Sequence, residues 1–172
     1  MVSALLQERL KGKTDVDRHE WAVTSAGTAD IWPEIDRHMI AAAKQVGVDV
    51  SEHRRRTLTK QVLNTNGADL VITMTREHLR AVIAIDQSAW QRTFTLKELA
   101  RRAVSVGPAS STDGYRDWLS RLAAGRKASE MMHPDPADDI ADPYGGPRRE
   151  HDAMVNTVHQ LVDEITRVGP WH

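Results

Sequence analysis

The chain of 172 residues contains no cysteine. This absence excludes disulfide bonds, thiolate zinc sites and any thiol nucleophile supplied by these residues. An excess of charge of either sign is also lacking, because 23 basic residues face 24 acidic ones. The chain therefore has no global basic field of the kind that attracts nucleic acid or anionic membranes, and we expect neither partner.

Long apolar runs are missing as well, so no segment predicts a membrane span. Residues 1–10 predict an amphipathic helix rather than a signal peptide, which favours a soluble protein of the cytoplasm. The length suits one domain with a full core, and no linker or internal repeat divides it. We expect a single domain over residues 1–172.

Helices and strands are predicted to alternate along the chain. Apolar spacing predicts helices over residues 4–10, 34–46, 95–102 and 148–168, with shorter ones near 58–63, after Thr75 and around 118–123. Strands are predicted at Trp21–Ser25, Ala68–Met74 and Thr93–Phe94, the second as a run buried on both faces of a parallel sheet. This order predicts a three-layer α/β fold with a mainly parallel sheet. The predicted strands are too few to form a sheet that so many helices could cover, which indicates that a strand is missing.

The stretch Ala141–Gly146 reads Ala-Asp-Pro-Tyr-Gly-Gly and stands just before the last predicted helix. Asp142 is the residue there that is best suited to proton transfer. Asp-Pro followed by Gly-Gly is equally ordinary turn composition. On spacing alone, a turn is the better interpretation of Asp142.

Other polar clusters favour structural interpretations. Arg54–Arg56 predicts a solvated basic patch, and Asp135, Asp138 and Asp139 predict a solvated acidic loop, because they lack the spacing and glycine of a calcium-binding loop. The eight histidines show no paired metal-binding spacing. We therefore expect no metal and no cofactor.

Five segments in register resemble the low-molecular-weight protein tyrosine phosphatases over nearly the whole chain. They are Ser25–Thr28, Gly47–Arg54, Ala68–Met74, Phe94–Leu99 and Asp142–Gly145. Residues 73–78 and the Phe-Thr-Leu-x-Glu-Leu segment are most similar to the actinobacterial-type members.

The resemblance implies a doubly wound sheet and a two-step hydrolysis of a phosphotyrosine protein or aryl phosphate. A cysteine thiolate in a Cys-x5-Arg loop attacks phosphorus, and water then cleaves the phosphocysteine. The loop follows the first strand and opens the first helix, where backbone N–H groups hold the phosphoryl oxygens. By the same resemblance Asp142 is the general acid and base, and Tyr144 and Trp32 line the substrate cleft. The alternative for both aromatics is a packing role, for Tyr144 at the entry to the last helix and for Trp32 in its loop.

The chain departs from the family at its start. Ala4–Leu10 matches the helix that follows the phosphate loop, and Met1 falls just after the position of the family's Arg-Ser-Pro. The first strand, the nucleophile and the loop arginine are thus not among these residues, and we expect an N-terminally truncated chain without phosphatase activity.

The missing strand would lie in the middle of the sheet. Loss of its buried residues costs on the order of 5–10 kcal/mol, against the roughly 5–15 kcal/mol that stabilises a domain. We expect marginal stability, or an open sheet that lets copies of the chain self-associate.

Two other functions fit the sequence less well. A non-catalytic phosphatase-like protein would use its open cleft to bind a partner segment. A related arsenate reductase shares the fold but needs thiols, which the absence of cysteine contradicts.

Overall fold

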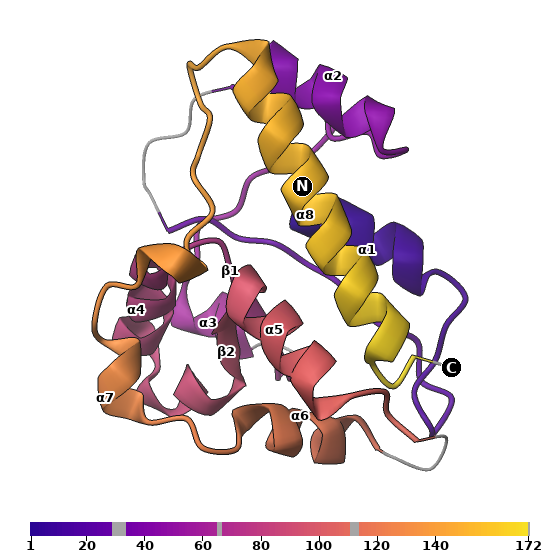
Figure 1. The fold of residues 1–172 in the computed structure, drawn as a ribbon, viewed down its shortest axis with the longest axis vertical. Coiled ribbons are helices and arrows are strands. Elements are labelled where there is room, and N and C mark those ends of the chain that lie inside the picture. Colours follow the sequence, from indigo (N-terminus) through magenta and orange to yellow (C-terminus); the bar gives the residue numbers. More distant parts are fainter. Residues whose placement is uncertain (29–33, 65–66, 111–113, 172) are drawn as a thin grey trace.

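The computed structural model describes residues 1–28, 34–64, 67–110 and 114–171 (Figure 1). Trp32 lies outside the described residues. The elements follow in chain order: α1 (Val2–Leu10), α2 (Arg37–Gln45), α3 (Lys60–Asn64), β1 (Val71–Thr73), α4 (Arg76–Ile85), η1 (Gln87–Arg92), β2 (Thr93–Thr95), α5 (Leu96–Val106), α6 (Tyr115–Ala123), α7 (Ala128–Met131), η2 (Pro136–Asp138) and α8 (Arg148–Val168).

The predicted helices are confirmed, and two of them begin at the predicted caps. The Thr75 side chain accepts a hydrogen bond from the His78 N–H at the start of α4. The Thr95 side chain does the same for the Glu98 N–H of α5. Both threonines satisfy a backbone donor that a helix N-terminus otherwise leaves unpaired.

The α/β class with parallel strand pairing is confirmed, although the sheet is small. In the described part of the chain β1 and β2 form a two-stranded parallel sheet, with Val71 opposite Thr93 and Thr73 opposite Thr95. The prediction that the first of these strands is buried on both faces is wrong, because Val71 and Ile72 are only half-buried. A neighbouring strand covers only an edge of β1, and its two faces depend on packed helices for burial.

The predicted strand Trp21–Ser25 is wrong. Its residues are extended, with Trp21, Val23 and Ser25 half-buried and the residues between them exposed, but they form no ladder. A strand requires a hydrogen-bonded neighbour. The described residues around it supply only the isolated bridges Thr14 to Glu20 and Gly27 to Thr57.

Aromatic packing holds this segment where a ladder is missing. The Trp21 ring lies 5.1 Å from the Tyr115 ring and 4.7 Å from the Trp171 ring, in edge-to-face arrangements. Trp118 of α6 is fully buried and packs on the same Trp171 ring at 5.7 Å. The N-terminal segment, α6 and the C-terminal tail therefore share one aromatic cluster.

The Ser25–Thr28 loop lies beside residues 56–58. The Gly27 N–H donates to the Arg56 carbonyl at 2.8 Å, and the Leu58 N–H donates to the Gly27 carbonyl at 2.7 Å. Arg54 and Arg56 are exposed, as expected of a solvated basic patch.

The main core forms around α8, which packs against α1, α2 and α5 (Figure 1). Its fully buried side chains on α8 include Val158 and Val162, which pack with Leu5 of α1 and Leu99 of α5. No helix in the described ranges is long and apolar enough to cross a membrane.

Candidate functional site

The loop that carries Asp142 passes the carboxyl end of β1. The Ile140 N–H donates to the Met74 carbonyl at 2.9 Å, one residue past the end of that strand. Ligands of parallel α/β folds bind beyond the carboxyl ends of the strands. Asp142 follows this hydrogen bond by two residues.

Asp142 and Tyr144 are brought together by a tight turn. The Asp142 Oδ1 accepts a hydrogen bond from the Tyr144 N–H at 3.0 Å, and both side chains are exposed while Pro143 between them is buried. The Gly146 N–H closes the turn by donating to the Pro143 carbonyl at 2.8 Å. The carboxylate is thus held by the backbone and open to a reactant, which suits a group that gives and takes protons.

The acidic stretch before this turn attaches the loop to α4 and α5. Asp138 has no exposed surface, and its carboxylate lies 2.5 Å from Arg76 Nη2 and 2.8 Å from Arg101 Nη1. The prediction of a solvated acidic loop is therefore wrong at Asp138. Two arginines from α4 and α5 converge on that position, and a buried carboxylate needs such partners. Asp135 keeps about half of its side-chain surface exposed (47%).

Asp139 ties the same loop to the starts of two helices. Its Oδ1 accepts from the Arg76 N–H of α4 at 2.7 Å, and its carbonyl accepts from Lys97 Nζ of α5 at 2.6 Å. Together with Asp138, these contacts fix the backbone three residues before Asp142.

A buried ionic network joins Arg126 to α5 and β2. Arg126 has a fully buried side chain, donates to Glu98 Oε1 at 2.9 Å and to the Thr93 carbonyl at 2.6 Å, and lies 3.9 Å above the Phe94 ring. Burial lowers the pKa of Arg126, and the charge of Glu98 opposes that shift. Sequence reasoning missed this network, because its members come from distant segments.

The N-terminal end of α1 is a second candidate position, because α1 corresponds to the helix that the phosphate loop precedes in the family that the sequence resembles. A hollow of about 240 Å³ lies there, lined by residues that include Met1, Ser3, Ser25 and His53. Burial is the main cause that lowers the pKa of His53. Helix N-termini offer backbone N–H groups to anions.

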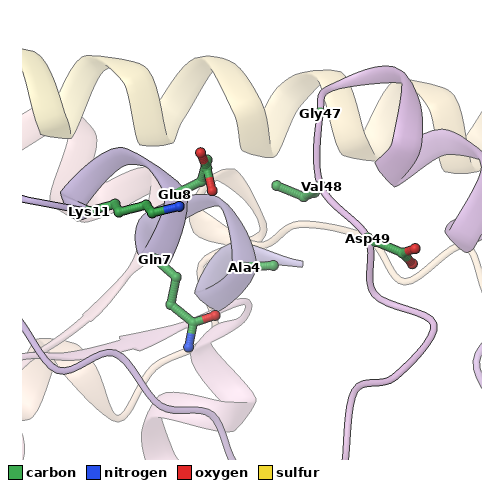
Figure 2. Close-up of a pocket in the computed structure, with 7 residues that line it drawn as sticks. All are labelled: Ala4, Gln7, Glu8, Lys11, Gly47, Val48 and Asp49. Carbon is green, nitrogen blue, oxygen red and sulfur yellow. The ribbon is translucent and has the colours of Figure 1, made fainter.

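A second hollow of about 300 Å³ continues along α1 (Figure 2). Ala4, Gln7, Glu8 and Lys11 of the helix line one side, and Gly47–Asp49 line the other. The two hollows share Ala4, Gln7 and Asp49, so they form one groove between α1 and the segment that follows α2.

Two groups of side chains could hold a metal ion among the described residues. One is Asp36, His38 and His151, and the other is the more exposed group Asp15, Asp17 and His19. Sequence reasoning missed the first group, because the fold alone brings His151 of α8 to the start of α2.

The comparisons with known proteins agree with the resemblance. Residues 3–106 match the family model described as low molecular weight phosphotyrosine protein phosphatase. Asp142 and Tyr144 lie beyond the matched range. No curated protein matches the chain.

Several solved structures share the fold at low sequence identity. The tyrosine phosphatase AmsI of Erwinia amylovora is 19% identical, with a TM-score of 0.62 over 98% of this chain and 82% of that one. A low molecular weight protein tyrosine phosphatase from T. tengcongensis is 21% identical, with a TM-score of 0.63 over 96% and 87%. The YwlE arginine phosphatase from Geobacillus stearothermophilus is 25% identical, with a TM-score of 0.61 over 96% and 80%. Because the family model covers more than half of the 172 residues, the chain belongs to the low molecular weight phosphotyrosine protein phosphatase family.

Proposed function

We propose that Asp142 is the general acid and base of a phosphotyrosine phosphatase whose nucleophile lies outside these 172 residues. The observation that carries this proposal is that Asp142 is an exposed carboxylate, held by the Tyr144 N–H on a loop that passes the carboxyl end of β1. The chain contains no cysteine, so by itself it has no thiol to attack phosphorus.

In this proposal the two halves of the site have separate tasks. The N-terminal end of α1 and a phosphate loop before it bind the phosphoryl oxygens. Asp142 protonates the leaving phenolate and then takes a proton from the attacking water. Tyr144, which is 57% exposed, walls the cleft, and Trp32 has the same proposed role.

The finer assignments belong to the same proposal. The protein is a cytoplasmic member of the actinobacterial type, with one domain over residues 1–172. An N-terminal strand between the Trp21 segment and β1 completes a doubly wound, three-layer sheet. Without that strand the chain is marginally stable and self-associates, and sedimentation over a range of concentrations tests this: association should disappear when the strand is added.

Hydrolysis of p-nitrophenyl phosphate tests the catalytic proposal. The chain of 172 residues should be inactive, and the same chain preceded by the family's first strand and Cys-x5-Arg loop should be active. In the extended chain Asp142→Asn should lower kcat by about 10²–10⁴-fold. Activity of the unextended chain that depends on Asp142 would refute our claim about the nucleophile. Phosphoarginine belongs in the substrate panel, because one structural neighbour is an arginine phosphatase.

A non-catalytic binding protein is the second candidate. The lack of a thiol and the open groove along α1 favour it. Calorimetry with a phosphotyrosine peptide distinguishes the two: binding by the unextended chain, together with an extended chain that stays inactive, would support this candidate over the first.

A further inference from the structure

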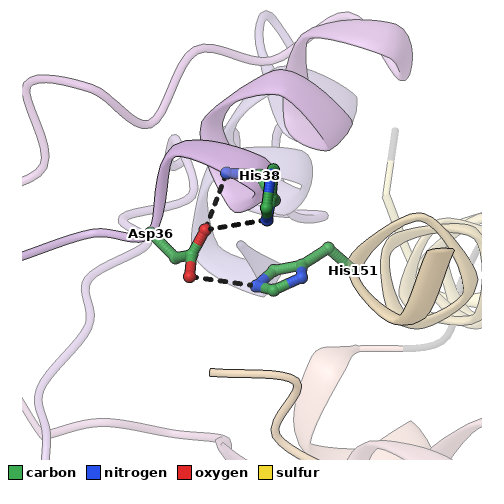
Figure 3. A group of neighbouring side chains, drawn as sticks. All are labelled: Asp36, His38 and His151. Atoms are coloured by element: carbon green, nitrogen blue, oxygen red, sulfur yellow. Dashed lines mark hydrogen bonds and ion pairs between the residues drawn. The ribbon is translucent and has the colours of Figure 1, made fainter. Parts of the chain in front are cut away.

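Three side chains from two helices converge at one point beside α8 (Figure 3). Asp36 directly precedes α2, His38 lies in its first turn, and His151 lies in the first turn of α8. The Asp36 Oδ1 lies 3.6 Å from His38 Nδ1, and the Asp36 Oδ2 lies 3.7 Å from His151 Nε2. The three ligand atoms all lie within 4.8 Å of one another.

The two imidazole nitrogens that face this point have no hydrogen-bond partner. His151 is fully buried (0% exposed), and its Nε2 is a buried polar atom without a partner in the described structure. His38 Nδ1 is in the same condition. Buried polar atoms are nearly always satisfied, so two unsatisfied nitrogens that face one carboxylate require an explanation.

The tautomer of His151 makes its inward nitrogen a ligand. His151 Nδ1 lies 3.3 Å from the Pro147 carbonyl oxygen, which can only accept a hydrogen bond, so Nδ1 carries the proton. In the neutral ring Nε2 then presents a lone pair towards Asp36. Metal-bound histidines are commonly oriented in this way by a carbonyl on their other nitrogen.

Asp36 is oriented just as firmly. Its Oδ1 accepts from the His38 N–H at 2.7 Å as the cap of α2. This bond leaves Oδ2 directed at His151 (Figure 3). A carboxylate can cap a helix with one oxygen and bind a cation with the other.

The donor set selects the kind of ion. Two imidazole nitrogens and one carboxylate oxygen are a common zinc set, and the bonds of about 2.0–2.2 Å that Zn²⁺ makes to them imply tetrahedral ligand separations of about 3.3–3.5 Å. The separation between the proposed ligand atoms Asp36 Oδ2 and His151 Nε2, 3.7 Å, is close to that value. The side chain of His38 is 32% exposed, so water can reach the fourth position.

We propose that Asp36, His38 and His151 bind a zinc ion, with water as the fourth ligand, and that this ion fastens α2 to α8. The proposal departs from the expectation of no metal, which rested on spacing along the sequence. It does not depend on the proposed phosphatase activity.

Calorimetry of the metal-free chain of 172 residues with Zn²⁺ tests the proposal. We expect one ion per chain and a Zn²⁺-dependent rise in the melting temperature. His151→Gln should weaken the affinity by about 100-fold or more, since even a lost second-shell partner costs 10–100-fold. His19→Gln is the matched control, because His19 belongs to the rival exposed group with Asp15 and Asp17 and should leave binding unchanged.

Two further measurements guard against a variant that fails to fold. His38→Gln replaces a partly exposed ligand and should weaken binding in the same way. X-ray absorption of the zinc-loaded wild-type chain should show two imidazoles bound to the ion. The proposal is overturned if the chain takes up no Zn²⁺, if binding survives in both His38→Gln and His151→Gln, or if it is lost in His19→Gln. The first result would identify the cluster as a histidine–aspartate ion pair.

Discussion

Asp138 and Arg76 form a buried ion pair, with Oδ2 and Nη2 2.5 Å apart and with 0% and 7% of their side-chain surfaces exposed. The pair joins the acidic loop to the first turn of α4. The Asp138 carboxylate, which takes no part in the proposed chemistry, therefore fixes the backbone that leads to Asp142.

Asp138→Asn should destabilise the protein strongly. The substitution leaves the Arg76 guanidinium buried without its counter-charge, and breaking a buried pair in this way costs about 3–5 kcal/mol. Urea unfolding measures the free energy. Asp135→Asn is the control, because Asp135 is 3.9 Å from Arg76 and 47% exposed, and it should cost less than about 1 kcal/mol. Equal losses in the two variants would contradict a special role for Asp138.

Arg126→Ala should also destabilise the protein, by about 3–5 kcal/mol. It removes the buried partner of Glu98 and the guanidinium that lies 3.9 Å above the Phe94 ring. Lys127→Ala is the control at the next residue. It breaks an exposed ion pair with Glu130, so it should change the free energy of unfolding by less than about 1 kcal/mol. A small loss in both variants would show that Arg102, the second partner of Glu98, is sufficient.

Gly146→Ala should disturb the turn that holds Asp142. An added Cβ would lie 2.8 Å from the Pro143 carbonyl oxygen and 2.7 Å from Glu150 Oε2. The carbonyl belongs to the turn itself and cannot move without opening it. In the extended, active chain we expect kcat to fall, with a smaller change in KM. Gly114→Ala, whose Cβ would meet only Asp117 Oδ2 at 3.6 Å, should leave kcat unchanged.

Tyr115 should make the protein less stable at alkaline pH. Burial, with a smaller contribution from the charge of Asp69, raises the pKa of Tyr115 in the folded protein. The unfolded chain therefore loses this proton first, at about pH 10. Stability is complete below that pH and falls above it, by up to about 1.4 kcal/mol per pH unit.

Urea unfolding measures the free energy of unfolding, and its dependence on pH between about 8 and 11 checks the Tyr115 prediction. Tyr115→Phe should flatten the alkaline decline. Tyr144→Phe removes an exposed hydroxyl and serves as the control. An unchanged decline in Tyr115→Phe would show that another group causes it.

Local features of this protein could be predicted from its sequence, and features that join distant segments could not. Threonine caps and apolar spacing are local, so α5 and α8 begin where the sequence indicates. The Trp21–Ser25 prediction failed because a strand depends on a neighbour that local composition does not reveal.

The candidate site divides in the same way. Turn composition and family resemblance indicated Asp142 and Tyr144. The burial of Asp138 depends on arginines from two other helices, and the Asp36–His151 contact joins residues that are distant in the sequence. Neither contact leaves a pattern along the chain.

The packing of Trp21 on Trp171 bears on the order of folding. The two rings lie 4.7 Å apart, although their residues stand near opposite ends of the sequence. Closing so long a loop is entropically costly and slow compared with forming local contacts. During synthesis this contact must wait until Trp171 has left the ribosome. The N-terminal segment, which forms no ladder with the described residues, takes its final place only after that point.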